Sequence, residues 1–473
     1  MLRVLLINPP WLFRPTTLWN FIDGKNIPYG IAYIAAVLKK NYTAVNVEII
    51  DAYAENLSLD ALRNRIKDFK PDILGITACT ANFKDAILVV QKVKEILPKC
   101  KIVIGGRHAT FCPEEALKYD FIDIVVRGEG EYTFLEIVEG VPIQSIKGIS
   151  YRIDGGITHN LNRELVEDID NIPIPAFELL PMKNYYLAAG QVKEFPAATL
   201  LGSRGCPGRC VYCSSSVFEN KVRYRSVKNI ISEIEYLILH YKIKEIHLLD
   251  DAFTANKELV LEFCNTIKQK NIKILWDCFS RASHVDFKLL LLMKNSGCRQ
   301  ISFGIESGDR EVLRSIKKGV TLEMMEQAIS DAKRAGLEVK SSFMLGLPMD
   351  TVESMQKTIK FAKKLDAHIA SFYIATPFPG TEMYTWASRE KRFKTQNWSL
   401  YDLTHPVMQL PYVTAEQVYD FYCKAWRVFY VNPVYLLKHL MMLNRFSDFS
   451  IYWRAICGIF YEVFFKKINK NNK

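Results

Sequence analysis

The 473-residue sequence lacks the long apolar runs that would anchor it in a bilayer or export it. Its opening apolar run, from Leu2 to Ile7, is too short for an export signal and is typical of a first β-strand. The last apolar run is interrupted by Arg454 and Glu462, so it does not reach the length of a membrane span. Without an export signal, the 11 cysteines are expected to stay reduced in a cytoplasmic protein.

Neither sign of charge is scarce, since 62 Lys and Arg residues stand against 51 Asp and Glu residues, for a net charge of +11. This excess permits anionic ligands, membrane surfaces or nucleic acid as partners. The basic residues are spread along the chain and form no single aromatic-basic stripe, so a nucleic-acid partner is not expected. The chain is long enough for two or three folded domains.

A fourth metal ligand is missing beside the most informative motif. Cys206, Cys210 and Cys213 follow the spacing C-x3-C-x2-C, and the nearest histidine, His240, lies far along the chain within a helical pattern. A zinc knuckle usually has a fourth Cys or His close by, and a disulfide pair is not expected in a reducing compartment. Three thiolates favour a [4Fe-4S] cluster with one open iron, so these cysteines are the predicted metal ligands.

Residues 1–150 alternate short apolar runs with helical patterns. The strands are expected at Val4–Ile7, Val47–Ile50, Ile73–Thr77, Ile102–Ile104 and Ile122–Val126, and the helices at Tyr29–Lys40, Leu59–Phe69 and Lys84–Leu97. Such alternation predicts an α/β domain with a Rossmann-like, doubly wound parallel sheet. Its ligand is expected beyond the carboxyl ends of the strands.

Residues 196–390 repeat the alternation and predict a partial (β/α)6 barrel, with its chemistry at the carboxyl ends of the strands. The six strands are expected at Ala198–Leu201, Glu245–Leu249, Ile274–Cys278, Gln300–Gly304, Val339–Met344 and Ala370–Ala375. Between the two domains, residues 151–195 form a connector that begins with a hairpin signal at Asp154-Gly155-Gly156.

Residues 391–473 predict an α-helical, basic and aromatic C-terminal tail. Val413–Tyr430 has a helical apolar stripe, and Pro433–Leu443 and Ile451–Phe465 mix aromatic and basic residues. Two interpretations stay open for this tail. It either packs onto the barrel as extra helices, or it lies on a membrane surface or binds a lipid-like substrate.

The three-cysteine loop, with Tyr212 before its last cysteine, resembles that of radical S-adenosylmethionine (radical SAM) enzymes. The resemblance continues through Gly304-Ile305-Glu306-Ser307, Gly346-Leu347-Pro348 and Thr376-Pro377-Phe378-Pro379-Gly380-Thr381. It implies that the cysteines hold a [4Fe-4S] cluster whose fourth iron binds the amino and carboxylate groups of SAM. It implies SAM-binding roles for Tyr212, Asp250, Asp251, Arg281, Glu306, Gly346 and Pro348.

Simpler roles compete for two of these positions. Asp250 and Asp251 precede a helical pattern, where a carboxylate can cap the helix while its neighbour accepts the ammonium of SAM. The guanidinium of Arg281 can bind a carboxylate through two hydrogen bonds or form a surface ion pair.

The loops of the first domain resemble the cobalamin-binding domain of B12-dependent radical SAM enzymes, through Pro28–Ala35, Gly105–Thr110 and Arg127–Glu131. The cobalamin-binding residues that this implies are Asn8, Pro9, Pro10, Thr77, Thr80, Gly105, Gly106, His108, Gly128 and Glu129. The D-x-H-x-x-G motif, whose His coordinates cobalt in many B12 proteins, is absent after the first strand. The lower cobalt ligand is therefore not predicted, and local hydrogen bonding is the alternative role for His108.

Three further cysteines, Cys79, Cys100 and Cys112, raise the alternative of a second cluster, as in methylthiotransferases. Their placement does not match the N-terminal pattern of that branch, so they are interpreted as buried, inert thiols.

Together the resemblances imply an anaerobic enzyme that cleaves SAM to a 5′-deoxyadenosyl radical and methylates an unactivated carbon via methylcobalamin. The first alternative is oxidative cyclisation or rearrangement of a tetrapyrrole-like substrate on the same cofactors, and the distant one is a zinc-containing nucleic-acid-binding protein. The expected partners are a small-molecule or lipid-like substrate and an electron donor such as flavodoxin or ferredoxin. The expected location is the cytoplasm, with peripheral membrane contact through the tail as the open question.

Overall fold

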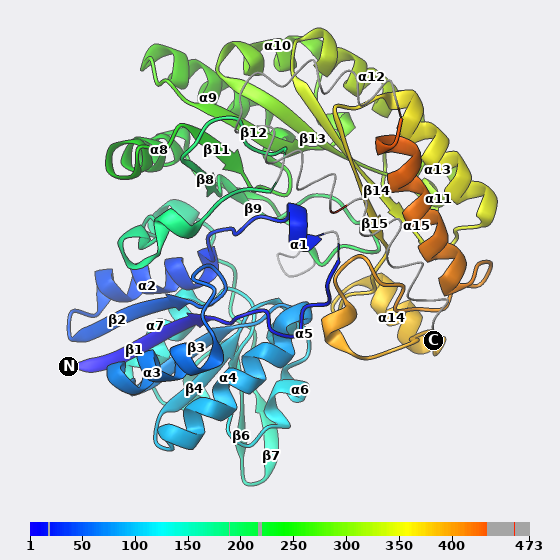
Figure 1. The fold of residues 1–473 in the computed structure, drawn as a ribbon. Helices are drawn as coiled ribbons and strands as arrows, with labels where there is room; N and C mark the ends of the chain where they lie inside the picture. The colour runs from blue at the N-terminus through cyan, green and yellow to red at the C-terminus, as the bar shows by residue number, and fades with distance from the viewer. Residues whose placement is uncertain (18, 189, 216–219, 433–457, 459–473) are drawn as a thin grey trace. The chain divides into compact units, whose positions relative to one another are not determined.

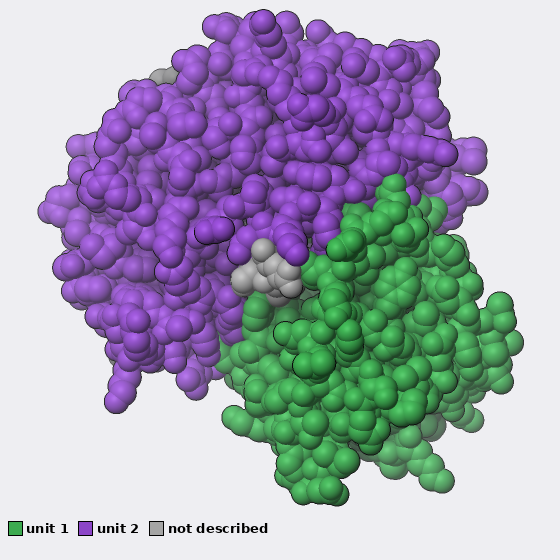
Figure 2. Space-filling view, turned by 180° about the vertical axis from the view of Figure 1, so that it is seen from behind, with its two compact units in different colours: residues 1–15, 25–185, 397–400 green, residues 16–24, 186–396, 401–473 purple. Residues whose placement is uncertain are grey.

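The computed structural model describes the chain except residues 18, 189, 216–219, 433–457 and 459–473. Its contacts divide it into two compact units, coloured separately in Figure 2. Unit 1 comprises residues 1–15, 25–185 and 397–400, and unit 2 comprises residues 16–24, 186–396 and 401–473. Each unit therefore combines segments that are distant in the sequence.

Unit 1 is built on a seven-stranded sheet of order β2-β1-β3-β4-β5-β6-β7 (Figure 1). Its strands are β1 (Leu2–Asn8), β2 (Val45–Asp51), β3 (Ile73–Thr77), β4 (Lys101–Gly105), β5 (Ile124–Val126), β6 (Ile149–Ile153) and β7 (Gly156–His159). The first five strands pair in parallel, and β6 and β7 add an antiparallel hairpin at one edge. The predicted hairpin is confirmed, and it extends the sheet.

Helices cover both faces of this sheet, as a doubly wound fold requires. They are α2 (Tyr29–Asn41), α3 (Leu59–Phe69), α4 (Phe83–Ile96), α5 (Arg107–Phe111), α6 (Pro113–Leu117) and α7 (Glu131–Glu139). α2 packs with α7, and α3 packs with α4 on the opposite face (Figure 1). A Cβ on Gly75 would lie 2.8 Å from the Phe134 ring, so β3 and α7 approach closely. The predicted Rossmann-like fold is confirmed.

Unit 2 is a curled half-barrel of six parallel strands in the order β15-β14-β13-β12-β11-β8. The strands are β8 (Ala197–Leu200), β11 (Glu245–Leu248), β12 (Leu275–Ser280), β13 (Cys298–Glu306), β14 (Glu338–Leu345) and β15 (Ile369–Ile374). The alternating helices are α8 (Val227–Tyr241), α9 (Lys257–Gln269), α10 (Phe287–Asn295), α11 (Arg310–Ser315), α12 (Leu322–Arg334) and α13 (Val352–Leu365). These helices line the outside of the curled sheet (Figure 1), so the predicted partial barrel is confirmed.

Three further helices complete the described part of unit 2: α1 (Trp19–Ile22), α14 (Glu382–Arg389) and α15 (Ala415–Tyr430). α15 matches the helix predicted in the tail, and it packs on the edge strand β15. There the Tyr430 hydroxyl accepts the Ala370 N–H at 3.1 Å and donates to the Ala370 carbonyl at 2.6 Å. The predicted segments Pro433–Leu443 and Ile451–Phe465 lie outside the described residues. No described helix has the length and apolarity needed to cross a membrane.

Candidate cofactor sites

The three-cysteine loop begins two residues beyond β9 (Ser203–Arg204), which pairs with β10 (Arg223–Tyr224) in a short antiparallel ribbon. Backbone hydrogen bonds fix the loop from two sides. The Cys213 N–H donates to the Cys210 carbonyl at 3.0 Å, and the Val211 N–H donates to the Ile316 carbonyl at 3.2 Å. The loop therefore lies at the carboxyl end of the half-barrel strands, where chemistry was predicted.

The thiols of this loop face donors. The Gly208 N–H donates to Cys206 Sγ at 3.4 Å, and Arg281 Nη1 donates to Cys210 Sγ at 3.8 Å. A Cβ on Gly208 would lie 2.7 Å from Arg281 Nη1 and 3.3 Å from Cys206 Sγ, so a larger residue there would displace the Arg281 side chain. Thiolate sulfurs that accept hydrogen bonds fit an iron–sulfur cluster, whose potential such bonds tune.

Burial raises the pKa of Cys206 and of Cys213, so both thiols hold their protons until a metal binds. Among the described residues, His108, Cys112 and Glu115 form the one group of three His, Cys or acidic side chains close enough to hold a single ion.

The adjacent carboxylates Asp250 and Asp251 lie in different environments. Asp250 is fully buried, and it accepts the Gly202 N–H at 2.7 Å and the Ser203 hydroxyl at 2.6 Å. Burial raises the pKa of Asp250 to about 7. Asp251 is exposed, and its charge acts on Cys206 and Cys213. Asp250 therefore fixes the strand that leads into the cysteine loop, while the exposed Asp251 is near enough for its charge to act on the thiols.

Glu306 ends β13 in a left-handed backbone conformation, with φ of +66°, beside a register shift in the β13–β14 pairing. Its Oε1 accepts Lys318 Nζ at 2.8 Å in a nearly buried ion pair, and Lys318 Nζ lies 3.4 Å from the Tyr212 hydroxyl. Burial and the Glu306 charge raise the pKa of Tyr212. A strained non-glycine backbone at a strand end is typical of functional sites. The structure thus brings Tyr212 and Glu306 together, as Lys318 joins them.

Arg281 and Gly346 also have structural partners. Arg281 Nη2 donates to the Lys318 carbonyl, so Arg281 lies between Lys318 and Cys210 and is not a surface ion pair. Gly346 has a φ of +80°, and a Cβ there would lie 2.7 Å from Val418 of α15. Gly346 is buried and Pro348 is half-buried.

In unit 1, two buried carboxylates fix the loop that follows β1. Asp51 accepts Asn8 Nδ2 at 2.8 Å and the Tyr185 hydroxyl at 2.9 Å. Asp85, at the start of α4, accepts the backbone N–H groups of Leu12 at 2.7 Å and of Phe13 at 3.2 Å. These bonds hold the loop after Pro9 and Pro10, which are themselves buried. No pattern in the sequence indicated this role for Asp85.

The loops after β3 and β4 are packed against each other. Gly106 has a φ of +97°, and a Cβ there would lie 2.6 Å from the Ala78 carbonyl and 2.9 Å from Thr77 Oγ1. The Ala78 N–H donates to the Gly105 carbonyl at 2.9 Å. After β5, Gly128 is exposed, and Glu129 Oε2 accepts the Val166 N–H at 3.0 Å. These predicted cobalamin residues therefore gather at the carboxyl ends of β3, β4 and β5.

His108 is fully buried, and both of its ring nitrogens face protein groups. Nδ1 lies 3.4 Å from Thr80 Oγ1, and Nε2 lies 3.5 Å from Glu115 Oε2. The Phe83 ring centroid is 4.1 Å from the imidazole, and Trp398 Nε1 donates to Glu115 Oε1 at 2.6 Å. Nδ1 therefore has the expected local hydrogen-bond partner, whereas Nε2 is buried without a hydrogen-bond partner among the described residues.

The cysteines expected to be buried and inert differ from one another. Cys100 is buried, and its burial raises the pKa of the thiol to about 12. Cys112 is half-buried and Cys79 is exposed, so burial was wrongly predicted for Cys79. Cys79 is exposed because it lies in the loop after β3, where it caps a short helical turn through Asn82.

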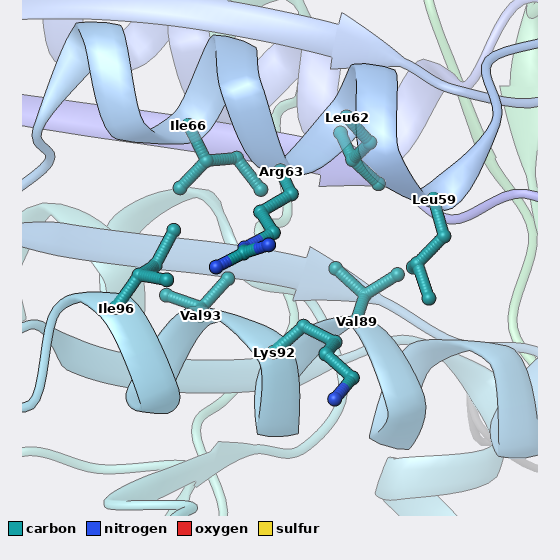
Figure 3. A pocket seen from close by; sticks show the side chains of 8 residues that line it. All are labelled: Leu59, Leu62, Arg63, Ile66, Val89, Lys92, Val93 and Ile96. Carbon is teal, nitrogen blue, oxygen red and sulfur yellow. The ribbon is translucent and has the colours of Figure 1, made fainter.

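Two surface depressions lie away from the predicted residues. One is shallow and lies between α3 and α4, where Leu59, Ile66, Val89 and Val93 form an apolar floor beside Arg63 and Lys92 (Figure 3). The other, of about 650 Å³, is in unit 2 beside Lys244, Ile274 and Gly297, which precede β11, β12 and β13. Neither contains a residue predicted to bind a cofactor.

A curled sheet of parallel strands with a three-cysteine loop after its first strand is typical of a class of enzymes that bind an iron–sulfur cluster at the rim of a half-barrel. The Radical SAM superfamily model matches residues 200–362, and the B12 binding domain model matches residues 19–138. The uncharacterized methyltransferase PH0819 of Pyrococcus horikoshii is 38% identical to this chain over 465 residues, which are 97% of this chain and 98% of the relative. The chain therefore belongs to the B12-binding branch of the radical SAM superfamily.

Two further matches agree with this assignment. The anaerobic magnesium-protoporphyrin IX monomethyl ester cyclase of Rubrivivax gelatinosus is 29% identical over 448 residues, which are 92% of this chain and 78% of the relative. The solved structure of the cobalamin-dependent radical SAM enzyme OxsB, with aqua-cobalamin and SAM bound, has a TM-score of 0.75 at 18% identity. That match covers 98% of this chain and 72% of OxsB, and it shows the fold. The predicted cofactors, a [4Fe-4S] cluster, SAM and cobalamin, are confirmed for this family, and the zinc-containing alternative finds no support.

Proposed function

We propose that this protein methylates an unactivated carbon of a small molecule. The rim of the half-barrel carries this proposal, because three thiols lie there with Arg281 donating a hydrogen bond to Cys210, in a chain with a B12 binding domain. When bound, the cluster and SAM supply a 5′-deoxyadenosyl radical, and cobalamin supplies the methyl group. A 38% identical relative that is itself named a methyltransferase supports methylation over other outcomes.

Each rim residue has a proposed task that suits its environment. Cys206, Cys210 and Cys213 hold three irons, and the exposed carboxylate of Asp251 accepts the ammonium of SAM. The Glu306–Lys318 pair orients the ribose end of SAM, with Tyr212 beside it. Arg281 fixes Cys210 and excludes water from the thiol. Gly346 and Pro348 present backbone edges for the adenine ring.

In unit 1, the proposed cobalamin surface consists of the loops after β1, β3, β4 and β5. The close packing at Gly106 and the bonds of Asp51 and Asp85 hold these loops in fixed positions before any ligand arrives. Asn8, Pro9, Pro10, Thr77, Thr80, Gly105, Gly128 and Glu129 complete this surface. The contact of His108 Nδ1 with Thr80 favours a positioning role for His108 over that of a cobalt ligand.

Oxidative cyclisation is the second candidate, because a cyclase is 29% identical over nearly the whole chain. The test is anaerobic reconstitution with iron, sulfide and cobalamin, followed by SAM and a strong reductant and mass spectrometry of the SAM products. S-adenosylhomocysteine together with 5′-deoxyadenosine supports methyl transfer. Deoxyadenosine alone supports cyclisation, and a colourless protein that leaves SAM intact overturns both candidates.

A further inference from the structure

The inner face of the half-barrel carries polar side chains that the rim does not use. Side chains alternate along a strand, so neighbours of outward residues point inward. On β12 the Trp276 ring packs outward on Phe263 of α9, and on β14 the Phe343 ring stacks on Phe372, which contacts Trp426 of α15. Asp277, one residue after Trp276, and Lys340, three residues before Phe343, are therefore on the opposite face and point inward.

Two residues on neighbouring strands, Ser302 and His247, also point inward. Ser302 of β13 is the register partner of Lys340, and His247 of β11 is the register partner of Asp277. Paired residues of adjacent strands share a face, so all four side chains point to the inside of the curl. We call His247, Asp277, Ser302 and Lys340 the inner polar row.

Two polar atoms of the inner polar row lack hydrogen-bond partners among the described residues. His247 Nδ1 and Asp277 Oδ1 form a hydrogen bond, but Asp277 Oδ2 and Ser302 Oγ are buried and have no hydrogen-bond partner among the described residues. Asp277 is 0% exposed and Ser302 is 2% exposed, so solvent does not replace the missing partners. Buried polar atoms without partners are rare in folded proteins, and each one calls for a ligand or another explanation.

Lys340 is also without a hydrogen bond or ion pair among the described residues, although it is half-buried. The negative charges that act on it are those of Asp277 and of Asp23, which belongs to unit 2 through the segment 16–24. Burial outweighs both charges and lowers the pKa of Lys340 to about 8. An ammonium in such surroundings gains from a direct oxyanion partner.

The inner polar row lies below the proposed SAM site. Ser302 precedes Glu306 by four residues on β13, which is about 13 Å along the strand. The row is therefore distinct from the residues proposed to hold SAM, and it lies on the inner face of the same sheet.

We propose that the inner polar row binds the substrate, and that this substrate is a small polar molecule with a carboxylate or phosphate beside a hydroxyl or amino group. Lys340 and Ser302 donate to the oxyanion, and Asp277 Oδ2 accepts from the neighbouring hydroxyl or amino group. His247 is a positioning residue, because it holds Asp277 through Oδ1. This inference rests on the proposed function, and it excludes a purely apolar, lipid-like substrate.

The test uses the reconstituted full-length protein, anaerobically and at constant ionic strength, and measures thermal stabilisation by three probes. Lactate carries a carboxylate beside a hydroxyl, sn-glycerol 3-phosphate carries a phosphate beside hydroxyls, and propane-1,2-diol is the neutral control. We expect saturable stabilisation by at least one of the two anions and none by the diol. Whichever anion binds more tightly identifies the source of the oxyanion.

Two variants and a matched control locate the binding. Lys340→Met and Ser302→Ala should each weaken anion binding, Lys340→Met by at least tenfold, because a charge-assisted hydrogen bond is lost. Lys360→Met, an exposed lysine on α13, should bind like the unmodified protein. Equal stabilisation by anions and diol, no stabilisation by any probe, or unchanged affinity in Lys340→Met would overturn the inference.

Different experimental outcomes would contradict this inference and the proposed function. The titration needs no turnover, so anion binding in a protein that does not cleave SAM would overturn the proposed function alone. SAM cleavage by a protein that binds neither anion would overturn only the assignment of the inner polar row.

Discussion

Arg281 donates a hydrogen bond from Nη1 to the Sγ of Cys210 at 3.8 Å, and its other terminal nitrogen donates to the Lys318 carbonyl. One guanidinium thus links the cysteine loop after β8 with the segment after β13. Contacts between strand ends therefore hold the rim of the half-barrel together. Single substitutions at the rim should change iron content, stability and SAM binding separately.

The cysteine assignment can be tested by iron content. Cys206→Ala, Cys210→Ala and Cys213→Ala should each lower bound iron to near background after anaerobic reconstitution, because three thiolates are needed for three irons. The matched control is the triple variant Cys79→Ala, Cys100→Ala, Cys112→Ala, which should keep the iron of the unmodified protein. Substantial iron loss in this control would favour a second cluster in unit 1.

The two adjacent carboxylates should behave differently. Asp250→Ala removes the acceptor of the Gly202 N–H and of the Ser203 hydroxyl, and should lower the free energy of unfolding by about 2–4 kcal/mol. Asp251→Ala, at an exposed position, should change that free energy by less than about 0.5 kcal/mol but raise the KM for SAM. Denaturation curves and initial rates check both results. A stable Asp250→Ala protein with weak SAM binding would reverse the two roles.

A glycine tests the packing of the proposed cobalamin loops. Gly106→Ala should destabilise the protein by at least about 2 kcal/mol, because φ is +97° and the new Cβ would meet the Ala78 carbonyl at 2.6 Å. It should also lower the cobalamin retained after gel filtration, measured by absorbance. Gly30→Ala in α2, where a Cβ meets no atom within 4 Å, should be stabilising by about 0.5–1 kcal/mol. Equal stability of the two variants would contradict the close packing.

The raised pKa of Asp85 predicts that the stability of the protein depends on pH. Burial raises the pKa of Asp85 to about 6, from 3.8, so between these values the folded protein holds a proton that the unfolded chain releases. Its contribution to the free energy of unfolding is therefore fully present below pH 3.8 and is lost as the pH rises through 6. Asp85→Asn keeps an oxygen acceptor and should flatten the slope by up to about 1.4 kcal/mol per pH unit in this window. Urea denaturation at several pH values measures the slope of the free energy of unfolding against pH. The control is Asp60→Asn, at an exposed position, which should keep the slope of the unmodified protein. Parallel slopes for Asp85→Asn and the unmodified protein would contradict the prediction.

The architecture was predictable because both units follow regular patterns. Leu59–Phe69 was predicted to the residue, since Ser58 caps the helix and Lys70 ends it in a left-handed conformation. The strand signals located every parallel strand to within a few residues, because each of these strands contains a short apolar run. The cysteine spacing likewise predicts the metal ligands by their chemistry, and this assignment stays a prediction.

The remaining features depend on contacts between distant residues. Asp250 and Asp251 cannot be told apart in the sequence, because the buried one is selected by Gly202 and Ser203 nearly 50 residues earlier. Asp85 bonds the loop at Leu12 and Phe13 across more than 70 residues. Trp398 reaches Glu115 in unit 1 from the far end of the chain. No local pattern encodes such pairings.

An open sheet has border strands whose unpaired amides and carbonyls can recruit a second polypeptide. At β15 a single phenol, that of Tyr430, occupies both the amide and the carbonyl of Ala370. This side chain from α15 therefore occupies the free backbone groups of one residue of the edge strand, which hinders the addition of another strand at that point.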